Sequence, residues 1–225
     1  VRRAVIGVNI GEVTPEDAAV AGLREIAGVK VGGYAGEDSP ALKAGIEPGD
    51  IITRADGRSV DRVSTLQRVI RGKKPGEMVD IEAMRYGTRK TFRVKLTSAP
   101  RDNGVVAAAG EEEPAAVTPT RSRLGVSVEP VSDELAQVAR MPEQFRGVRV
   151  AEVEPGSPAE IRISVNDVIV QVLPEKRRIS STADLQKALE GVRSGEYVSL
   201  LGYRPIRGGG GQTFVVNLKT ADSGR

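Results

Sequence analysis

The feature that most constrains the fold of this chain is an internal repeat that spans nearly all of its 225 residues. Turn, helix and strand signals recur in the same order at a nearly constant offset, which indicates a duplicated domain. We therefore expect two domains of about 100 residues, each large enough to bury its own core. Matching residues, separated by 118 or 119 positions, are Ile6 and Leu124, Ser39 and Ser157, Leu66 and Leu185, and Gly76 and Gly195.

The stretch between the two copies differs in composition from both of them. Residues 97–120 are rich in Ala, Gly, Pro and Glu, lack aromatic side chains and include three consecutive glutamates. Such a composition is typical of a linker. We predict a first domain over residues 1–97, a linker over residues 98–120 and a second domain over residues 121–221. The first residue is Val and no leader segment is recognisable, so we expect a mature product or a piece of a longer protein.

The composition excludes several kinds of catalytic chemistry. The chain contains no His and no Cys. A Ser-His-Asp triad, a Cys nucleophile and zinc sites built from His or thiolate are therefore impossible. We expect no catalytic residue, no metal site and no cofactor in this chain. A protease that uses a Ser-Lys pair stays as an alternative, which cleavage of a peptide by the isolated chain would support.

Neither the charge balance nor the hydropathy indicates a nucleic-acid or membrane partner. Lys and Arg number 33 against 30 Asp and Glu, a net charge of +3. The basic clusters at residues 71–74 and 176–178 contain no aromatic side chains for base stacking, so we interpret both as solvated surface. Because no run of about 18 apolar residues occurs, we expect no membrane-spanning helix.

Local signals in the first copy predict short helices and hairpins. Thr14, followed by Pro and two acidic residues, is typical of a helix start, and this helix should end near Gly28. A second helical stretch is expected over residues 39–45. The third helix should run from Ser64, with Ser64 or Asp61 as its cap. Hairpin turns are predicted at residues 55–57 and 86–87.

The opening strand of each copy combines two features of a ligand site. Ile6, Val8 and Ile10 alternate along an extended stretch, and a glycine between the first two allows close approach to the backbone. Such a loop can offer N–H groups to an anion, while the strand after it can offer unpaired backbone groups to an extended peptide. A helix beginning at Ser64, or at Ser181 in the second copy, would form the other wall of a groove. Alternatively, the glycine only permits a β-bulge.

Taken in order, these motifs resemble the PDZ domains of the HtrA/Deg serine proteases. Each copy opens with an Ile/Leu-Gly-Val loop preceded by Arg, continues through Ser-Pro-Ala, and ends with a Leu-Gln helix and a Gly-Glu turn. The first copy also contains a Gly-Asp-Ile-Ile turn at residues 49–52. The resemblance covers the chain except the linker. It implies an α+β fold of two circularly permuted bacterial PDZ domains, each a partly open β-barrel of five or six strands with two helices.

The resemblance also implies one peptide-binding site in each copy. The carboxylate-binding loop would be Ile6-Gly7-Val8 in the first copy and Leu124-Gly125-Val126 in the second, with an arginine ahead of each loop adding charge. The next strand residues and two helix residues would complete each site, while Leu66 and Leu185 would belong to the core. The implied binding residues of the first copy are Arg3, Ile6, Gly7, Val8, Asn9, Ile10, Gln67 and Ile70. Those of the second copy are Arg121, Leu124, Gly125, Val126, Ser127, Val128, Gln186 and Leu189.

The second copy departs from the family pattern in one turn. Where the first copy reads Ala-Gly-Ile-Glu-Pro-Gly-Asp over residues 44–50, the second reads Arg-Ile-Ser-Val-Asn-Asp over residues 162–167. This turn is one residue shorter and lacks both glycines. Asn166 can adopt the left-handed conformation, at a greater cost than Gly. We therefore expect a remodelled turn and a weaker case for ligand binding by the second copy.

The family resemblance implies a peptide-binding and regulatory function. A trypsin-like protease domain precedes two PDZ domains in this family, so the full-length protein is expected to be a serine endopeptidase, although this chain is not an enzyme. The expected ligands are hydrophobic C-terminal or extended segments of misfolded proteins, bound by strand addition. The expected partners are the protease domain and other subunits of a homo-oligomer, in the periplasm or cell envelope. The alternatives are a module for oligomer assembly and gating, or a PDZ scaffold of another envelope protein.

Overall fold

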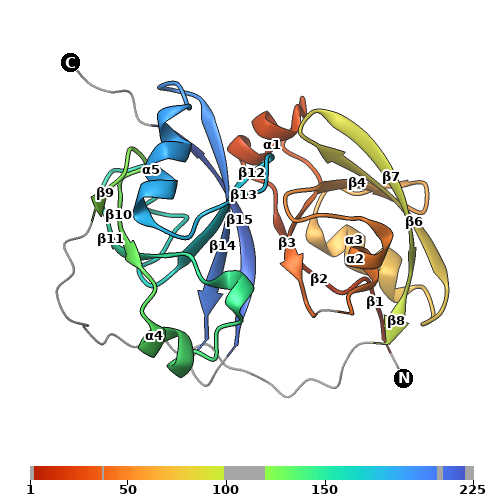
Figure 1. The fold of residues 1–225 in the computed structure, drawn as a ribbon. Coiled ribbons are helices and arrows are strands. Elements are labelled where there is room, and N and C mark those ends of the chain that lie inside the picture. Colours follow the sequence, from red (N-terminus) through yellow and green to blue (C-terminus); the bar gives the residue numbers. More distant parts are fainter. Residues whose placement is uncertain (1–2, 37, 99–119, 207–209, 221–225) are drawn as a thin grey trace. The chain divides into compact units, whose positions relative to one another are not determined.

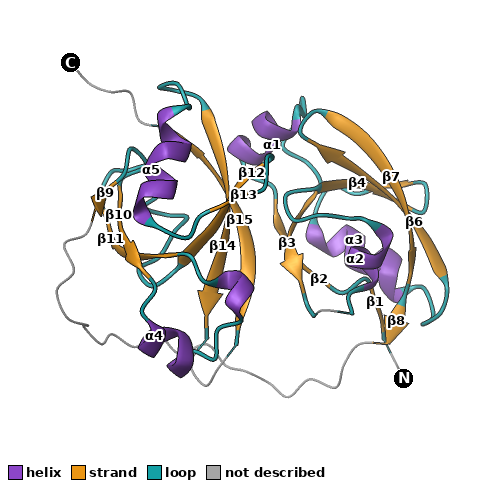
Figure 2. Ribbon diagram, in the orientation of Figure 1, coloured by secondary structure: helices purple, strands orange, loops and turns teal. Residues whose placement is uncertain are grey.

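The computed structural model describes residues 3–36, 38–98, 120–206 and 210–220, and the chain folds as two compact units. We call residues 3–98 the first module and residues 120–220 the second module (Figure 1). Strands predominate in both, with short helices beside them (Figure 2), so the predicted α+β class is confirmed. Among the described residues, no helix is long and apolar enough to cross a membrane.

An open antiparallel sheet of six strands forms the framework of the first module. Its strands are β2 (Val8–Glu12), β3 (Val29–Tyr34), β4 (Ile51–Ala55), β5 (Arg58–Ser59), β6 (Met78–Arg85) and β7 (Thr88–Lys95). The order is β2-β3-β4-β6-β7, with β5 paired to β4. A separate two-stranded ladder joins β1 (Ala4–Val5) to β8 (Thr97–Ser98). Among the described strands, β2 pairs only with β3, so one edge of β2 is unpaired.

Two helices of the first module begin where the sequence predicts. Helix α1 (Pro15–Ala21) follows Thr14, which forms a reciprocal capping box with the third helical residue. The helix ends at Gly22, in the left-handed conformation with φ of 68°, and therefore earlier than the predicted end near Gly28. Helix α2 (Pro40–Ala44) lies in the second helical stretch that the sequence predicts.

Helix α3 (Val63–Arg71) starts one residue before the predicted position. The predicted cap by Ser64 or Asp61 is wrong, because the residue before the helix makes no side-chain bond to the backbone and Ser64 lies within the first turn. Instead, the amide N–H of Val63 donates to Oε1 of Glu12, at the end of β2, over 3.3 Å. A strand residue far away in the sequence therefore satisfies the first turn of this helix.

The core of the first module is aliphatic and joins the sheet to α3. Alternate residues of β3 and β6 are buried, as expected for strands with one face on the core. Leu66 is a core residue, as predicted, with 1% of its surface exposed. Burial of each such side chain contributes about 1.5–3 kcal/mol. Members of this core include Ile6, Val29, Val31, Ile52, Leu66, Ile70, Val79, Ile81 and Val94.

A sheet of seven strands forms the framework of the second module. Its strands are β9 (Thr120–Arg121), β10 (Val126–Pro130), β11 (Val148–Val153), β12 (Val168–Leu173), β13 (Arg177–Arg178), β14 (Tyr197–Pro205) and β15 (Gly211–Lys219). The order is β15-β14-β12-β11-β10-β9, with β13 paired to β12. The strand that matches β2 of the first module is β10, and here it lies between two partners instead of at the edge.

The helices of the second module are α4 (Asp133–Val138), the single-turn 3₁₀ helix η1 (Glu143–Phe145) and α5 (Thr182–Glu190). Ser181 caps α5 in a capping box, as predicted for a helix start at this residue. Leu185 of α5 is fully buried, which confirms its predicted place in the core. The ring of Phe145 stacks on that of Tyr203, with centroids 4.7 Å apart.

The turn before β12 is remodelled as the sequence predicts. Asn166 takes the place of a glycine and adopts a left-handed conformation with φ of 73°. Its Oδ1 accepts a hydrogen bond from Nη1 of Arg149, a buried guanidinium that also donates to the carboxylate of Glu129. These bonds hold the asparagine in a conformation that costs more than it would for glycine.

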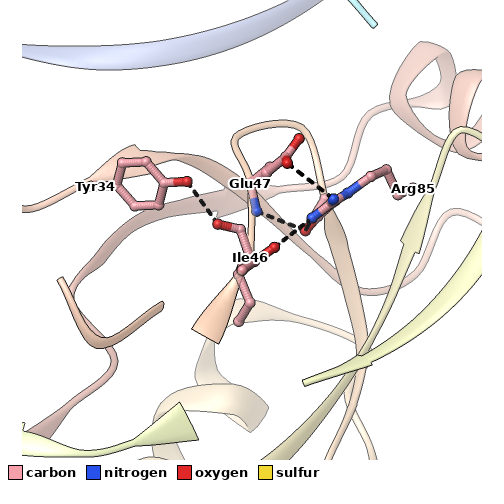
Figure 3. A network of polar contacts seen from close by, with 6 residues as sticks. Tyr34, Ile46, Glu47 and Arg85 are labelled. Atoms are coloured by element: carbon pink, nitrogen blue, oxygen red, sulfur yellow. Dashed lines mark hydrogen bonds and ion pairs between the residues drawn. The ribbon is translucent and has the colours of Figure 1, made fainter. Parts of the chain in front are cut away.

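Each module holds the corresponding turn with a buried aspartate. In the first module, Oδ2 of Asp50 accepts from the amide of Glu47 over 2.9 Å, and its carboxylate receives two bonds of 2.6 Å from Arg85. Arg85 also reaches the Glu47 carboxylate at 3.3 Å (Figure 3). In the second module, Asp167 and Arg204 form the matching pair. The duplicated pair fixes the turn to the strand that carries the arginine, β6 in the first module and β14 in the second.

Tyr34 joins this network in the first module only. Its hydroxyl donates to the carbonyl oxygen of Ile46 over 2.7 Å (Figure 3). Burial raises the pKa of Tyr34 to about 12, and the nearby charges of Glu47 and Asp50 act in the same direction, while Arg85 opposes them. The phenol of Tyr34 therefore stays protonated at pH values where an exposed tyrosine would lose its proton.

The ends of the expected linker take part in strands. Residues 97–98 form β8 of the first module, and residues 120–121 form β9 of the second. The interior of the expected linker, residues 99–119, lies outside the described residues, as do residues 207–209 between β14 and β15.

Candidate peptide-binding site

The unpaired edge of β2 presents backbone hydrogen-bonding groups. Val31 of β3 directs its N–H and C=O toward β4, donating to Asp50 O over 2.9 Å and accepting from Gly49 N over 2.7 Å. Ile10, which lies opposite Val31, therefore has no backbone bond to it and points its own N–H and C=O toward the unpaired edge. The alternation along the strand gives Val8 the same direction. An extended peptide can pair with these groups.

The loop before β2 is fixed by hydrogen bonds that its carbonyl oxygens accept, while its amide groups remain accessible. Gly7 has φ of 72°, and a Cβ at this position would lie 2.8 Å from Cδ of Pro40, so only glycine fits without a shift. The Gly7 oxygen accepts from the Ala35 amide over 2.9 Å and from Oγ of Ser39 over 2.6 Å. The Ile6 oxygen accepts from the backbone as well. Within the described part of the chain, the amide N–H groups of Ile6 and Gly7 form no hydrogen bond. The loop thus keeps two donors for an anion.

Helix α3 lies next to β2 and supplies the apolar flank of the site. Val63, Val8 and Ile10 are only partly buried and pack against the edge of the core, so apolar surface is accessible on both elements. Gln67 is also partly exposed, and its Oε1 accepts from Arg71 over 3.4 Å. The start of α3 is tied to the far end of β2 by the bond from Val63 to Glu12 described above.

The other expected residues of the first module lie in different surroundings. Asn9, on β2, faces β3 and pairs with Gly33. Ile70 is 6% exposed and belongs to the core, as does Ile6 at the same exposure. Their side chains are therefore supports for the site and not its surface. Arg3 is exposed ahead of β1.

The corresponding edge in the second module is occupied. The strand β9 pairs with β10, with Arg121 opposite Ser127 and Thr120 opposite Val128. The amide and the hydroxyl of Ser122 both donate to the Val126 oxygen over 2.9 Å. Backbone groups that match the unpaired ones of β2 are therefore already bonded within the chain.

In the second copy, the loop amide is already hydrogen-bonded and the strand side chains are buried. The amide of Gly125 donates to the Ser122 oxygen over 3.1 Å, whereas the matching Gly7 amide is not used in this way. Val126 and Val128 are each 1% exposed, in contrast to Val8 and Ile10. Of the other expected residues, Leu124 and Leu189 are buried and Gln186 is exposed.

Three residues of the first site escape the sequence prediction. Ser39 supports the loop, Val63 lines the flank, and Glu12 joins the strand to the helix. Val63 shares the helical spacing of Leu66 and Ile70, a signal that an earlier helix start would have included. The role of Glu12 depends on a contact across the fold, and no local pattern indicates it.

The fold and this edge-and-loop site define the class of the protein. The PDZ domain family matches residues 5–96 and 122–219, and the chain therefore belongs to the PDZ family, with two domains in tandem. The predicted tandem of PDZ domains is confirmed.

The relatives extend the resemblance to a group of proteases. A probable periplasmic serine endoprotease, DegP-like, of Pseudomonas fulva (strain 12-X) is 32% identical over 200 residues, which are 89% of this chain and 40% of that protein. The DegP-like relative of Brucella suis biovar 1 (strain 1330) is 32% identical over 203 residues, or 89% and 37% of the two chains. The chain thus spans about 40% of the length of such curated relatives.

A solved structure also shares sequence with part of this chain. A structure of the HtrA-type protease AlgW with a decapeptide is 29% identical, covers 45% of this chain and 31% of that chain, and has a TM-score of 0.41. The predicted resemblance to PDZ regions of HtrA/Deg-type proteases is confirmed by the DegP-like relatives.

Proposed function

We propose that the first module binds an extended peptide by strand addition to the unpaired edge of β2. The observation that carries this proposal is the pair of accessible surfaces on one edge: unbonded backbone groups of the strand and loop, and partly exposed Val8 and Ile10 beside α3. Backbone pairing would supply affinity, and the apolar side chains would select the residues of the ligand.

The loop amides indicate that the ligand ends in a carboxylate at this point. The N–H groups of Ile6 and Gly7 are available to an anion, and Arg3 supplies a positive charge ahead of the loop. Hydrogen bonds to a charged group contribute about 1.5–3 kcal/mol. A carboxylate should therefore bind roughly 10-fold or more tightly than a neutral group at the same place.

The tandem then serves a larger protein as its substrate-recognition and regulatory part. The relatives are named periplasmic serine endoproteases, and this chain matches only the PDZ part of such a protein. We infer a full-length periplasmic endopeptidase of the HtrA type, in which the first module captures hydrophobic C-terminal or extended segments of misfolded proteins. Its partners would be the protease domain of the same chain and other subunits of a homo-oligomer.

The test uses peptides that differ only at the last group. A display library of random decapeptides with free C-termini is selected against the 225-residue chain, and the tightest peptide is then made with a carboxylate and with an amide end. Fluorescence anisotropy should give about 10-fold weaker binding for the amide. Equal affinity of the two peptides contradicts the carboxylate site, and failure to select any peptide contradicts strand addition.

The closed edge of β10 favours a second candidate function for the other module. A module whose ligand edge is filled by its own chain is suited to contacts of a different kind, such as docking onto neighbouring subunits and gating of the protease. Light scattering of the full-length protein, with and without residues 121–225, tests this function. A smaller oligomer without them supports assembly by the second module, and an unchanged size contradicts it.

A further inference from the structure

The residues from Thr120 to Val128 form a complete β-hairpin. The Ser122 oxygen accepts from the amide of Gly125, which closes a four-residue turn, and Gly125 follows with φ of 76°. Residues 120–121 then run antiparallel to β10. A turn that ends in a left-handed glycine is one of the common three-residue hairpin connections, so this geometry carries no unusual cost.

The hairpin uses the part of β10 that a peptide would use. The bonds from Ser122 to the Val126 oxygen show that Val126 points its backbone groups away from β11. Val150 of β11, which lies opposite Val128, is bonded to the turn before β12 instead, through Asp167 O and Asn166 N. Val128 therefore also points to the outer edge, where Thr120 now lies.

We propose that β9 is an internal ligand of the second PDZ domain, which keeps other peptides from adding to β10 while it is in place. The segment mimics an antiparallel peptide strand, and the loop glycine that would face a carboxylate closes the hairpin instead. This proposal rests on the proposed function in one respect, namely that peptides bind by strand addition. The pairing of β9 with β10 rests on the hairpin alone.

The covalent connection makes this occupant hard to displace. The turn joins β9 directly to β10, so the pairing is intramolecular and does not depend on concentration. A free peptide must compete with a strand held at an effective concentration of roughly millimolar or more. Only a peptide with considerably more contacts, or an event that draws β9 away, would then open the second site.

A disulfide test reports the pairing in solution, because the chain has no native Cys. Arg121 and Ser127 lie opposite each other between hydrogen-bonded positions, where Cα atoms are about 4.5 Å apart and can be bridged. In Arg121→Cys/Ser127→Cys, we expect a cross-link that resists glutathione. The matched control is Arg3→Cys/Asn9→Cys, the same positions of the first copy, which should cross-link roughly 10-fold less readily because Arg3 precedes β1 and not a strand on β2.

Equal cross-linking in the two variants, or none in the second module, overturns the proposal. A second measurement needs no cysteine: amide hydrogen exchange of Val128 in the native chain. In Thr120→Pro, the proline lacks the N–H that pairs with β10, and we expect exchange at Val128 to become about 10-fold faster. An unchanged rate contradicts pairing by β9, whatever the cysteine variants do.

Peptide binding separates this proposal from the function of the first module. The selected carboxylate peptide is titrated into the native chain and into oxidised Arg121→Cys/Ser127→Cys. We expect the same affinity and one peptide per chain in both, since the cross-link only fixes an occupant already there. Loss of a bound peptide on cross-linking overturns the internal ligand. If no peptide binds at all, the proposed function of β2 fails while the cross-link and exchange results still decide the pairing of β9.

Discussion

The two modules contain the same loop motif, and they differ in the path that the chain takes just before this loop. In the first module Ala4 is buried and leads the chain to β8, away from β2. In the second module the residues that match Ala4 and Val5 are the polar Ser122 and Arg123. Arg123 is exposed and donates to the Val192 oxygen. Because they do not pack into a core, the chain folds back onto β10. The comparison shows that a binding loop depends on the direction from which the chain enters it.

The support of the loop differs between the modules in the same direction. Ser39 bonds to the Gly7 oxygen and also caps α2 through the Leu42 amide. The matching Ser157 has a buried hydroxyl without a hydrogen-bond partner among the described residues. The first copy thus has an open loop that Ser39 supports, whereas the second has a closed loop without the matching serine bond among the described residues.

The largest expected difference concerns the duplicated ion pair. Asp50→Asn should destabilise the first module by about 3 kcal/mol, because Arg85, 15% exposed, loses its charged bonds of 2.6 Å to Asp50 and keeps the more distant carboxylate of Glu47 at 3.3 Å. Asp167→Asn should cost roughly 1–2 kcal/mol less, because Arg204 is 50% exposed and can return to water. Denaturant-dependent hydrogen exchange, read from core amides of each module, measures both. Equal losses would show that the two pairs are equivalent.

Alanine at the two loop glycines should separate stability from binding. A Cβ at Gly125 would lie 2.1 Å from Cβ of Ser157, and one at Gly7 would lie 2.8 Å from Pro40. We expect Gly125→Ala to cost about 2–3 kcal/mol and Gly7→Ala about 1–2 kcal/mol.

Only the change at Gly7 should weaken peptide binding, by roughly 10-fold. Gly36→Ala is the control, because its Cβ would meet nothing within 4 Å. Anisotropy titrations and unfolding curves of the three variants supply the numbers. A loss of peptide affinity in Gly125→Ala, with Gly7→Ala unaffected, would reverse the assignment of the two loops.

Removing the two serine hydroxyls should have unequal effects. Ser39→Ala deletes a helix cap and a bond to the loop, so the first module should lose about 1–2 kcal/mol and bind peptide more weakly. Ser157→Ala removes a hydroxyl that has no partner among the described residues, and should change stability by less than about 0.5 kcal/mol or raise it. Thermal unfolding of each variant against the native chain checks both values, and a costly Ser157→Ala would show an interaction of its hydroxyl in solution.

The smallest effect is an alkaline one in the first module. The pKa of Tyr34 is raised to about 12, so the folded state holds its proton more tightly than the unfolded state does. The stability that this provides is fully present below about pH 10 and is lost as the pH rises toward 12.

Tyr34→Phe should therefore reduce the alkaline loss of folding stability of the first module by roughly 1 kcal/mol. This value is reduced for the partial exposure of the ring. Burial also raises the pKa of Tyr203, so the second module keeps its own alkaline loss in this variant. Module-specific unfolding between pH 9 and 12 provides the comparison. An identical pH profile of the first module in both proteins would contradict the effect of Tyr34.

Features that depend on neighbouring residues could be predicted from the sequence. The caps at Thr14 and Ser181, the left-handed Asn166 and the α+β class all follow from signals within a few positions. The site loop of the first module could be placed for the same reason, since its glycine and alternating apolar residues are contiguous.

Features that depend on contacts between distant residues could not be predicted from the sequence. The cap of α3 comes from Glu12, 51 residues before Val63. The resemblance implies that Ile70 belongs to the site, yet this residue is buried, because the helical pattern does not separate a core face from an adjoining ligand face. The pairing of β9 with β10 competes with pairing elsewhere, and only the folded module decides between them.

The most direct test of the difference between the two modules is amide hydrogen exchange at Ile10 and Val128 in the native chain. These residues are 118 positions apart and occupy matching places on β2 and β10, with backbone groups directed to the outer edge. We predict that Val128 exchanges at least about 10-fold more slowly than Ile10, relative to their intrinsic rates, and that the selected peptide slows only Ile10. Equal protection of the two amides without peptide, or slowing of Val128 by the peptide, would contradict an open first site and a self-occupied second one.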